Sequence, residues 1–369
     1  MREFDVLVIG GGLNGLCAAW WLLRRGVKRV GLVERFTLGH DHGSSHGASR
    51  ITRSAYADAV YVRLMQVAHA EAWPALEADA ATRLIHRRDA CLFGPNGGPF
   101  QDYLDALAGI DVDVETLDPA EARRRFPVFR FPGDLGVLHD RTAGIVAAAD
   151  TIAALARIVR AGATVIEGAT VLGVDPISRV VDTQDGPLRA ERIIVTAGAW
   201  AGRLLPGLAG RLTPVRQTVV HLAVDGDAAA FPLWAWRGLG DFYYGLPSFQ
   251  RPGIKAAKHV LDGPPALDPD APVDAPETRD VLAFLEEHLV SPPREVLATE
   301  RCLYTVTDDE DFVLDHHPAS AAVTVGAGFS GHGFKFGPLT GRILAELCLD
   351  GETTVAPFEA ARARFGWGA

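Results

Sequence analysis

The chain has few of the features that mark membrane, nucleic-acid-binding or disulfide-stabilised proteins. Its 36 Lys and Arg residues are outnumbered by 46 Asp and Glu residues, giving a formal net charge of −10, which argues against a nucleic-acid or anionic-membrane partner. No apolar run is long enough to span a bilayer. The first apolar run follows Met1 so closely that we expect no signal peptide. The four cysteines, Cys17, Cys91, Cys302 and Cys348, show no C-x-x-C spacing. We therefore expect neither a zinc site nor a disulfide framework, and a reducing cytoplasm as the location.

The composition is that of an ordinary globular protein. Hydrophobic residues make up 48% and charged residues 22% of the 369 residues, which is typical of folded domains. The length suggests about two domains. No internal repeat is found in the sequence.

The most informative pattern lies in the first 35 residues. An apolar run, residues 5–9, is followed by Gly10, Gly12 and Gly15 in the spacing G-x-G-x-x-G, and residues 16–23 are again apolar. This order predicts a strand, a tight glycine turn and a helix. The glycines let the backbone approach a pyrophosphate, which the free N–H groups and the dipole of a helix N-terminus stabilise. The segment therefore predicts a dinucleotide site.

An acidic residue refines this prediction. A second apolar run, residues 30–33, ends at Glu34, about 20 residues beyond Gly15, where a carboxylate accepts a hydrogen bond from a ribose hydroxyl. A carboxylate there disfavours a cofactor with a 2′-phosphate. FAD and NAD both remain as candidates.

A polar loop follows the second strand. Residues 37–49 are rich in Gly, Ser and His and have no helical or strand period, which is typical of a loop. Arg50 and Arg53 follow it three positions apart, which on a helix would put both guanidinium groups on one face. Such a pair usually forms only a solvated face. Its place behind a dinucleotide motif and a site-like loop favours a functional role.

Two later segments repeat the strand, glycine turn and helix. Residues 193–195 predict a buried strand before Ala197-Gly198-Ala199-Trp200, and residues 322–327 predict another before GFSGHGFKF, residues 328–336. Lys335 stands in the first turns of the helix that follows, where a cation opposes the helix dipole. This placement suggests a nearby anion or cofactor. Both segments predict that the chain returns to the cofactor domain.

The segments between these returns favour strands. Residues 213–249 alternate as short strands with turns and predict an antiparallel sheet. Lys255 lies in a strand-like segment, and residues 295–307 predict a strand that contains Cys302. Taken alone, Lys255 would be an ordinary exposed lysine and Cys302 a small buried hydrophobe.

Further elements follow from periodicity and turn residues. Residues 61–78 predict an amphipathic helix that Pro74 kinks or ends. A hairpin is predicted for residues 180–192 and a helix for residues 277–289. Residues 264–276, rich in Pro and Asp, predict an irregular excursion.

Together these motifs resemble the monomeric sarcosine oxidase family, which belongs to the D-amino-acid-oxidase-like flavoproteins. The segments that carry the resemblance are the N-terminal motif, SSHGASRITRSAY, FYYGLPSF, GIKAAKH, RCLYTVT and GFSGHGFKF. They span nearly the whole chain in the family's order. The cysteine before L-Y-T and the GFSGHGFKF turn are much more specific than the first motif.

The resemblance implies an α/β fold of mixed α+β character. A Rossmann-like FAD-binding domain would be interleaved with an antiparallel-sheet substrate domain. Residues 1–85, 141–213 and 305–369 would form the FAD-binding domain, and residues 86–140 and 214–304 the substrate domain.

The resemblance also implies site residues. Cys302 resembles the cysteine bonded to the flavin 8α-methyl carbon, Arg53 and Lys335 the pair that grips the substrate carboxylate, and Lys255 the lysine that assists oxygen reduction. Besides Lys255, the expected catalytic residues are His46, Arg50, Tyr244 and His259. Tyr56 and Tyr304 would line the substrate. The expected FAD-binding residues are Gly10, Gly12, Leu13, Asn14, Gly15, Glu34, Arg35, Ser45, Arg50, Val171, Ala197, Gly198, Trp200, Cys302, Gly328, Gly331, Gly333 and Lys335. No metal ligands are expected.

The implied activity is an FAD-dependent oxidase of a secondary amino acid, N-methyl or cyclic, such as sarcosine. It would oxidise the C–N bond to an imine and release hydrogen peroxide. The planar fork of Arg and the point charge of Lys suit a carboxylate, and tyrosines with Trp234 or Trp236 would form apolar walls. The expected partners are a small amino acid and oxygen, and the expected state is a monomer or small homo-oligomer.

Three alternatives stay open on the sequence. The first is a dehydrogenase on the same fold that passes electrons from a pipecolate-, proline- or N-methyltryptophan-type substrate to another carrier. Lys255 favours the oxidase over this dehydrogenase. The second is a flavoprotein that only binds cofactor, against which Cys302 and the two carboxylate-binding cations speak. The third is an NAD-dependent dehydrogenase, which the first motif alone would allow.

Overall fold

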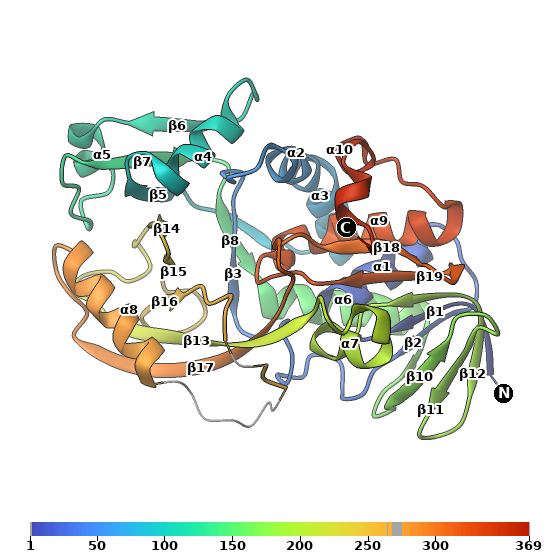
Figure 1. Cartoon of the computed structure of the whole chain (residues 1–369). Helices are drawn as coiled ribbons and strands as arrows, with labels where there is room; N and C mark the ends of the chain where they lie inside the picture. Colours follow the sequence, from blue (N-terminus) through green and yellow to red (C-terminus); the bar gives the residue numbers. More distant parts are fainter. Residues whose placement is uncertain (1, 264, 268–274, 369) are drawn as a thin grey trace.

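The computed structural model describes residues 2–263, 265–267 and 275–368. Two large sheets lie side by side, and helices pack around the one that contains the N-terminal strand (Figure 1). The predicted excursion at residues 264–276 lies largely outside the described residues.

The first large sheet is built around β12 (Leu188–Val195), which runs parallel to β1 (Arg2–Ile9) and to β19 (Ser320–Ala327). This arrangement brings the three predicted glycine turns to one edge, because each turn follows the carboxyl end of one of these parallel strands. The other strands of this sheet are β2 (Val30–Val33), β9 (Thr164–Ile166), β10 (Val171–Asp175), β11 (Val180–Thr183) and β18 (Val313–His317).

Three helices cover this sheet with apolar faces. α1 (Leu13–Arg24) packs against α6 (Ala148–Gly162) and α9 (Gly337–Asp350). Their buried side chains form one hydrophobic core with the strands. Burial of this apolar area fixes α1, and with it the glycine turn that precedes the helix.

The second large sheet has eight strands in a mainly antiparallel order, with one parallel pair, β14 and β5. α8 (Ala275–His288) covers one face, where Trp234 stacks on Phe284. The other face carries Tyr244 and Lys255, which line a cavity. In order across the sheet the strands are β17 (Glu295–Val306), β13 (Thr213–Ala223), β16 (Ile254–Lys258), β15 (Phe242–Leu246), β14 (Leu233–Arg237), β5 (Ala90–Pro95), β7 (Leu135–Asp140) and β6 (Val114–Leu117).

A small third sheet stands between the two large ones (Figure 1). It consists of β3 (Ser49–Thr52), β8 (Gly144–Ala147) and β4 (Ile85–Arg87). The remaining α-helices are α2 (Ala59–Val67), α3 (Trp73–Ala80), α4 (Gly98–Leu107), α5 (Pro119–Arg125), α7 (Ala201–Leu204) and α10 (Ala356–Ala360). Short helices of other types are η1 (Ala68–Ala72, a π-helix), η2 (Gly198–Trp200), η3 (Pro206–Leu208), η4 (Gly333–Phe336) and η5 (Arg362–Phe365).

The fold class and the strand–turn–helix order are confirmed. The hairpin of β11 and β12 and the helix α8 are also found where they were predicted. The boundaries of the two interleaved domains at the residues given above stay a prediction. Among the described residues, every helix is too short or too polar to cross a membrane.

One local prediction is wrong. Arg50 lies in a strand, β3, and Arg53 follows it, so the pair does not share a helix face; pairing with β8, where Arg50 lies opposite Val146, overrides the spacing. The helix predicted for residues 61–78 is found as the helical run of α2, η1 and α3, and the π-helical turn η1 interrupts it and ends at Ala72, two positions before Pro74. Pro74 has no N–H to donate to the carbonyl group four residues before it, and a π-helical turn is one way in which a helix accommodates a missing donor.

Candidate functional site

A cavity of about 1150 Å³ extends from the turn after β1 to the inner face of the second sheet. Its wall includes the turns that follow β1, β12 and β19, as expected for three returns of the chain. Nearly all of the predicted site residues line it. The exceptions are Gly15 and Gly328, which lie behind the wall.

The turn after β1 depends on its glycines. Gly10 has φ +101°, in the left-handed region that favours glycine. A Cβ on Gly15 would lie 1.9 Å from the Gly10 carbonyl oxygen, so only glycine lets the helix pack this closely. Gly12 caps α1 without a side chain, and the Leu13 N–H donates to Ser45 Oγ at 3.0 Å. The helix N-terminus therefore faces the cavity as an anion site.

Glu34 fixes this turn from the adjacent strand. Its two carboxylate oxygens accept the N–H groups of Gly11 at 2.6 Å and Phe36 at 2.8 Å. Each oxygen keeps a second lone pair. The buried carboxylate can therefore hold the turn and still accept a ribose hydroxyl.

The end of the cavity beside Glu34 has an aromatic and cationic wall. The Arg35 guanidinium lies 5.8 Å from the Trp200 ring centre, and Phe36 packs edge-on to Trp200 at 6.0 Å. Val171, Ala197 and the positive-φ residue Gly198 complete this wall.

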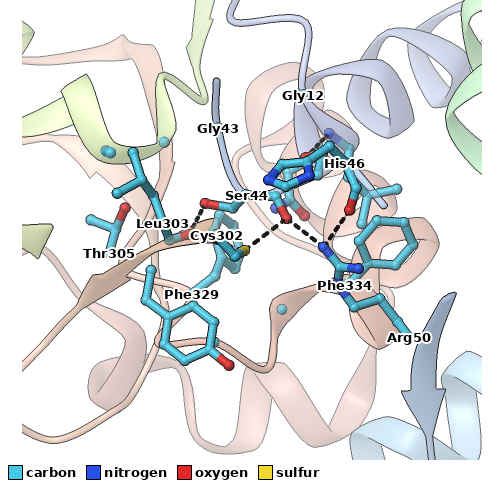
Figure 2. Close-up of a pocket in the computed structure, with 18 of the residues that line it drawn as sticks. Gly12, Gly43, Ser44, His46, Arg50, Cys302, Leu303, Thr305, Phe329 and Phe334 are labelled. Atoms are coloured by element: carbon cyan, nitrogen blue, oxygen red, sulfur yellow. Dashed lines mark hydrogen bonds between the residues drawn. The ribbon is translucent and has the colours of Figure 1, made fainter. Parts of the chain in front are cut away.

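The polar loop is pinned beside Cys302 (Figure 2). The Arg50 guanidinium donates to the carbonyl groups of Ser44 at 3.0 Å and His46 at 2.6 Å, and lies 5.3 Å from the Phe334 ring centre. Cys302 Sγ is 3.9 Å from the Ser44 carbonyl oxygen. Cys302 is a partly exposed free thiol in the cavity wall, which differs from the buried residue that a strand cysteine suggests.

Arg53 and Lys335 meet at the opposite end of the cavity. The Arg53 guanidinium lies 4.6 Å from the Tyr56 ring centre, and the Lys335 Nζ donates to Tyr56 Oη at 3.0 Å. One terminal nitrogen of Arg53 is buried without a hydrogen-bond partner in the described part of the chain. Burial and the Arg53 charge lower the pKa of Lys335 well below its usual value. A carboxylate between the two groups would satisfy the nitrogen and restore the lysine charge.

Three further predicted residues face this end: Tyr244 from β15, Tyr304 from β17, and His259 from the segment directly after β16. Tyr244 Oη lies 3.4 Å from Tyr304 Oη. His259 packs against Tyr304 with ring centres 5.3 Å apart, and burial lowers the pKa of His259. These side chains form a wall that is apolar except at its hydroxyl and imidazole groups.

Sequence reasoning missed two residues of this wall. Glu310 Oε2 lies 3.9 Å from His259 Nε2, and the neighbouring His259 holds the pKa of Glu310 below its usual range. His332 accepts or donates to Tyr56 Oη at 3.4 Å and contacts the Glu310 carbonyl oxygen at 3.0 Å. His332 belongs to the GFSGHGFKF turn, so that motif contained a signal for it.

Lys255 enters the middle of the cavity from β16. It is 6% exposed, and its Nζ donates to the Ser49 carbonyl oxygen at 2.9 Å. Burial and the Arg50 charge lower the pKa of Lys255 to about 7. Burial and the same Arg50 charge lower the pKa of His46 to about 4. Lys255 is therefore a proton donor poised near neutral pH, beside a neutral imidazole.

The two tryptophans do not form the substrate wall that was predicted for them. Trp234 is buried in the core under α8, where it stacks on Phe284, and Trp236 packs against His288 on the same face of the sheet. Strand alternation explains this, because residues 234 and 236 share one face and Ala235, between them, lines the cavity. Gly328 has φ +64° and lies where a Cβ would meet Thr307 at 2.5 Å, so it shapes the turn behind the wall.

The cavity fits FAD by these observations. A left-handed glycine turn opens at a helix N-terminus, a buried carboxylate stands at the ribose position, and a wall of mixed aromatic and cationic side chains continues to a separate anion-binding end. A single cavity thus joins a nucleotide end to a small-molecule end.

Comparisons with known proteins agree with this arrangement. Residues 5–347 match the family model described as FAD dependent oxidoreductase. Peroxisomal sarcosine oxidase of Mus musculus is 35% identical over 377 residues, covering 97% of this chain and 96% of the relative. Monomeric sarcosine oxidase of Arthrobacter sp. (strain TE1826) is 30% identical over 371 residues, covering 95% of this chain and 94% of the relative. The open form of NikD, described as an unusual amino acid oxidase essential for nikkomycin biosynthesis, superposes with a TM-score of 0.80 at 28% identity, covering 96% of each chain.

Proposed function

Because the chain belongs to the FAD-dependent oxidoreductase family, we propose that it is an oxidase of secondary amino acids. The substrate would carry an N-methyl or cyclic amine next to a carboxylate. Its CH–NH group would be oxidised to an imine, and oxygen would be reduced to hydrogen peroxide. The named sarcosine oxidases and N-methyl-L-tryptophan oxidase among the relatives support this substrate class.

FAD, when bound, supplies a two-electron acceptor for the amine. The N-terminus of α1 and the turn from Gly10 would hold its pyrophosphate, and Glu34 would accept from its ribose. Cys302 would be the point of covalent attachment, since its thiol is free and stands in the cavity wall. Arg50 would keep the polar loop in place beside it.

Recognition of the substrate carboxylate is the observation that carries the proposal. Arg53 offers a buried N–H group without a partner in the described residues, and Lys335 stands beside it with a depressed pKa. A buried N–H without an acceptor and a lysine whose charged form is disfavoured both raise the free energy of the site, and a bound anion would lower it. Tyr244, His259 and Tyr304 would then enclose the amine and exclude water.

Lys255 favours oxygen as the electron acceptor over another carrier. A positive charge in a water-poor site stabilises an anion that develops on oxygen far better than the same charge in bulk water. The depressed pKa of Lys255 also lets it release a proton near neutral pH. A dehydrogenase would need neither property at this position.

A panel of amines tests the proposal. Sarcosine, N-methyltryptophan, proline and pipecolate would be offered to the purified yellow protein, and peroxide release and oxygen uptake measured together. We expect peroxide to match oxygen uptake for at least one of these amino acids. Turnover that requires an artificial dye and consumes no oxygen would favour the dehydrogenase instead.

A further inference from the structure

A row of polar side chains, His221, Glu300 and Arg251, leads from Lys255 toward the protein surface and is called the polar arm here. Lys255 of β16 is paired directly with His221 of β13, and Glu300 of β17 is paired with Val219, two positions from His221. Directly opposed residues, and residues two apart on a strand, point to one face. The side chains of Lys255, His221 and Glu300 are therefore neighbours on the face that lines the cavity.

The arm continues from His221 to the protein surface. His221 Nε2 lies 3.5 Å from Glu300 Oε2, and Glu300 forms an ion pair with Arg251. The exposure of these side chains rises along the arm, from 8% for His221 to 20% for Glu300 and 45% for Arg251. A graded series of titratable groups thus connects solvent with the buried lysine.

His221 is the group that can move a proton between these ends. Its Nε2 is buried without a hydrogen-bond partner among the described residues. Burial and the charges of Lys255 and Arg251 lower the pKa of His221 to about 4. The imidazole is therefore neutral near neutral pH and can take up a proton on one nitrogen and release one from the other.

The other groups around Lys255 do not lead to the surface in this way. Arg50, from β3, stays protonated at ordinary pH. His46, from the preceding loop, lines the cavity itself, and the Ser49 carbonyl oxygen accepts from Lys255 without offering a proton.

We propose that His221 and Glu300 return protons from solvent to Lys255 while oxygen is reduced. This inference rests on the proposed oxidase function. Oxidation of CH–NH to C=N releases two electrons and two protons, and oxygen takes up two electrons and two protons to become hydrogen peroxide. When the Lys255 ammonium gives a proton to the reduced oxygen, neutral His221 takes up a proton from solvent at Glu300, whose carboxylate stabilises the imidazolium that forms. The imidazolium then gives the proton on its other nitrogen to the neutral Lys255 amine, which restores the ammonium and the neutral imidazole.

The test follows reoxidation of the reduced holoenzyme by oxygen during repeated turnover, in H₂O and D₂O and across neutral pH. His221→Phe removes both ring nitrogens, and we expect it to slow this phase by roughly 10²-fold, the lower end of the range for a lost proton-transfer group. The remaining rate should show a larger solvent isotope effect and a changed pH profile. His221→Gln, which is polar but cannot relay a proton, should behave alike if the Phe variant does not fold.

A matched control and a readout independent of turnover complete the test. His317→Phe changes a half-buried histidine of β18, outside the arm, and should leave all of these quantities as in the parent. In NMR titrations, Glu300→Gln should lower the pKa of His221 further, because it removes the adjacent negative charge. An unchanged His221 pKa would mean that the two groups are not coupled, and would overturn the arm.

The outcomes separate this inference from the function on which it rests. If oxygen does not reoxidise the reduced parent enzyme, the oxidase proposal fails. If Lys255→Met leaves fast reoxidation by oxygen unchanged, Lys255 is not the oxygen site and the arm is refuted with it, while the oxidase function stands. If Lys255→Met slows reoxidation while His221→Phe leaves the rate, pH profile and isotope effect unchanged, the arm alone is refuted.

Discussion

Replacing Arg53 by Met tests whether Arg53 binds the substrate carboxylate, as proposed above. Met keeps an unbranched stem that can still pack over the Tyr56 ring, on which the guanidinium lies at 4.6 Å. The change removes the planar donor fork and leaves Lys335 as the remaining cation of the pair. The nucleotide end of the cavity is formed by other segments, so flavin content should stay as in the parent.

The expected loss follows from the burial of this pair. Truncating one partner of a buried, hydrogen-bonded charge pair costs roughly 2–5 kcal/mol. At about 1.4 kcal/mol per factor of ten, kcat/KM should fall by about 30-fold to about 4,000-fold. Because Arg53 no longer repels its charge, the pKa of Lys335 should rise, which places the loss toward the lower part of that range.

The assay compares an N-methyl amino acid with its methyl ester in both proteins. The ester lacks the carboxylate but keeps the amine and side chain. We expect Arg53→Met to reduce kcat/KM strongly for the acid and only slightly for the ester. An equal loss for acid and ester, or no loss for the acid, would refute carboxylate binding by Arg53.

Three further predictions follow from the same structure. Cys302→Ala should fold and bind flavin but release all of it on acid precipitation, whereas the parent precipitate should stay yellow; a colourless parent precipitate would exclude covalent attachment. Gly15→Ala should abolish flavin binding, because its Cβ would lie 1.9 Å from a backbone oxygen of the glycine turn, whereas Gly173→Ala, with open space around its Cβ, should retain full flavin content; equal content in both variants would contradict this role. Since the pKa of Lys255 is about 7, its charge is present below that pH and lost above it, so reoxidation by oxygen should slow as pH rises through 7; in Lys255→Met reoxidation should be slow at every pH, and a parental profile in that variant would contradict the assignment.

The glycine turn and the carboxylate beside it could be predicted from the sequence because the constraints there are local. A glycine turn between a strand and a helix is compatible with few other local structures. A Cβ on Gly15 would clash with the Gly10 carbonyl oxygen of the same turn, so this constraint also lies within a short stretch of sequence. Glu34 was found by its distance along the chain, since two parallel strands fix where the second one ends. The resemblance to a family supplied the distant residues Lys255, Cys302 and Lys335.

The predictions that were wrong depended on contacts between distant segments. Arg50 and Arg53 have a spacing that suits a helix, but β8, nearly one hundred residues later, pairs with this segment as a strand. Trp234 and Trp236 were placed on the wrong face, because a run that is apolar on both sides of the strand gives no alternation to follow. Glu310 lies in an acidic loop whose sequence resembles a solvated turn, and only the fold brings it to His259.

Anaerobic mixing of the purified protein with a secondary amino acid tests the central claim most directly. The account predicts that sarcosine or a related N-methyl or cyclic amino acid bleaches the flavin absorption without oxygen. Admission of oxygen should then restore the absorption and release one peroxide for each amine consumed. A flavin that stays oxidised with every secondary amino acid would contradict the account, and so would bleaching that oxygen does not reverse.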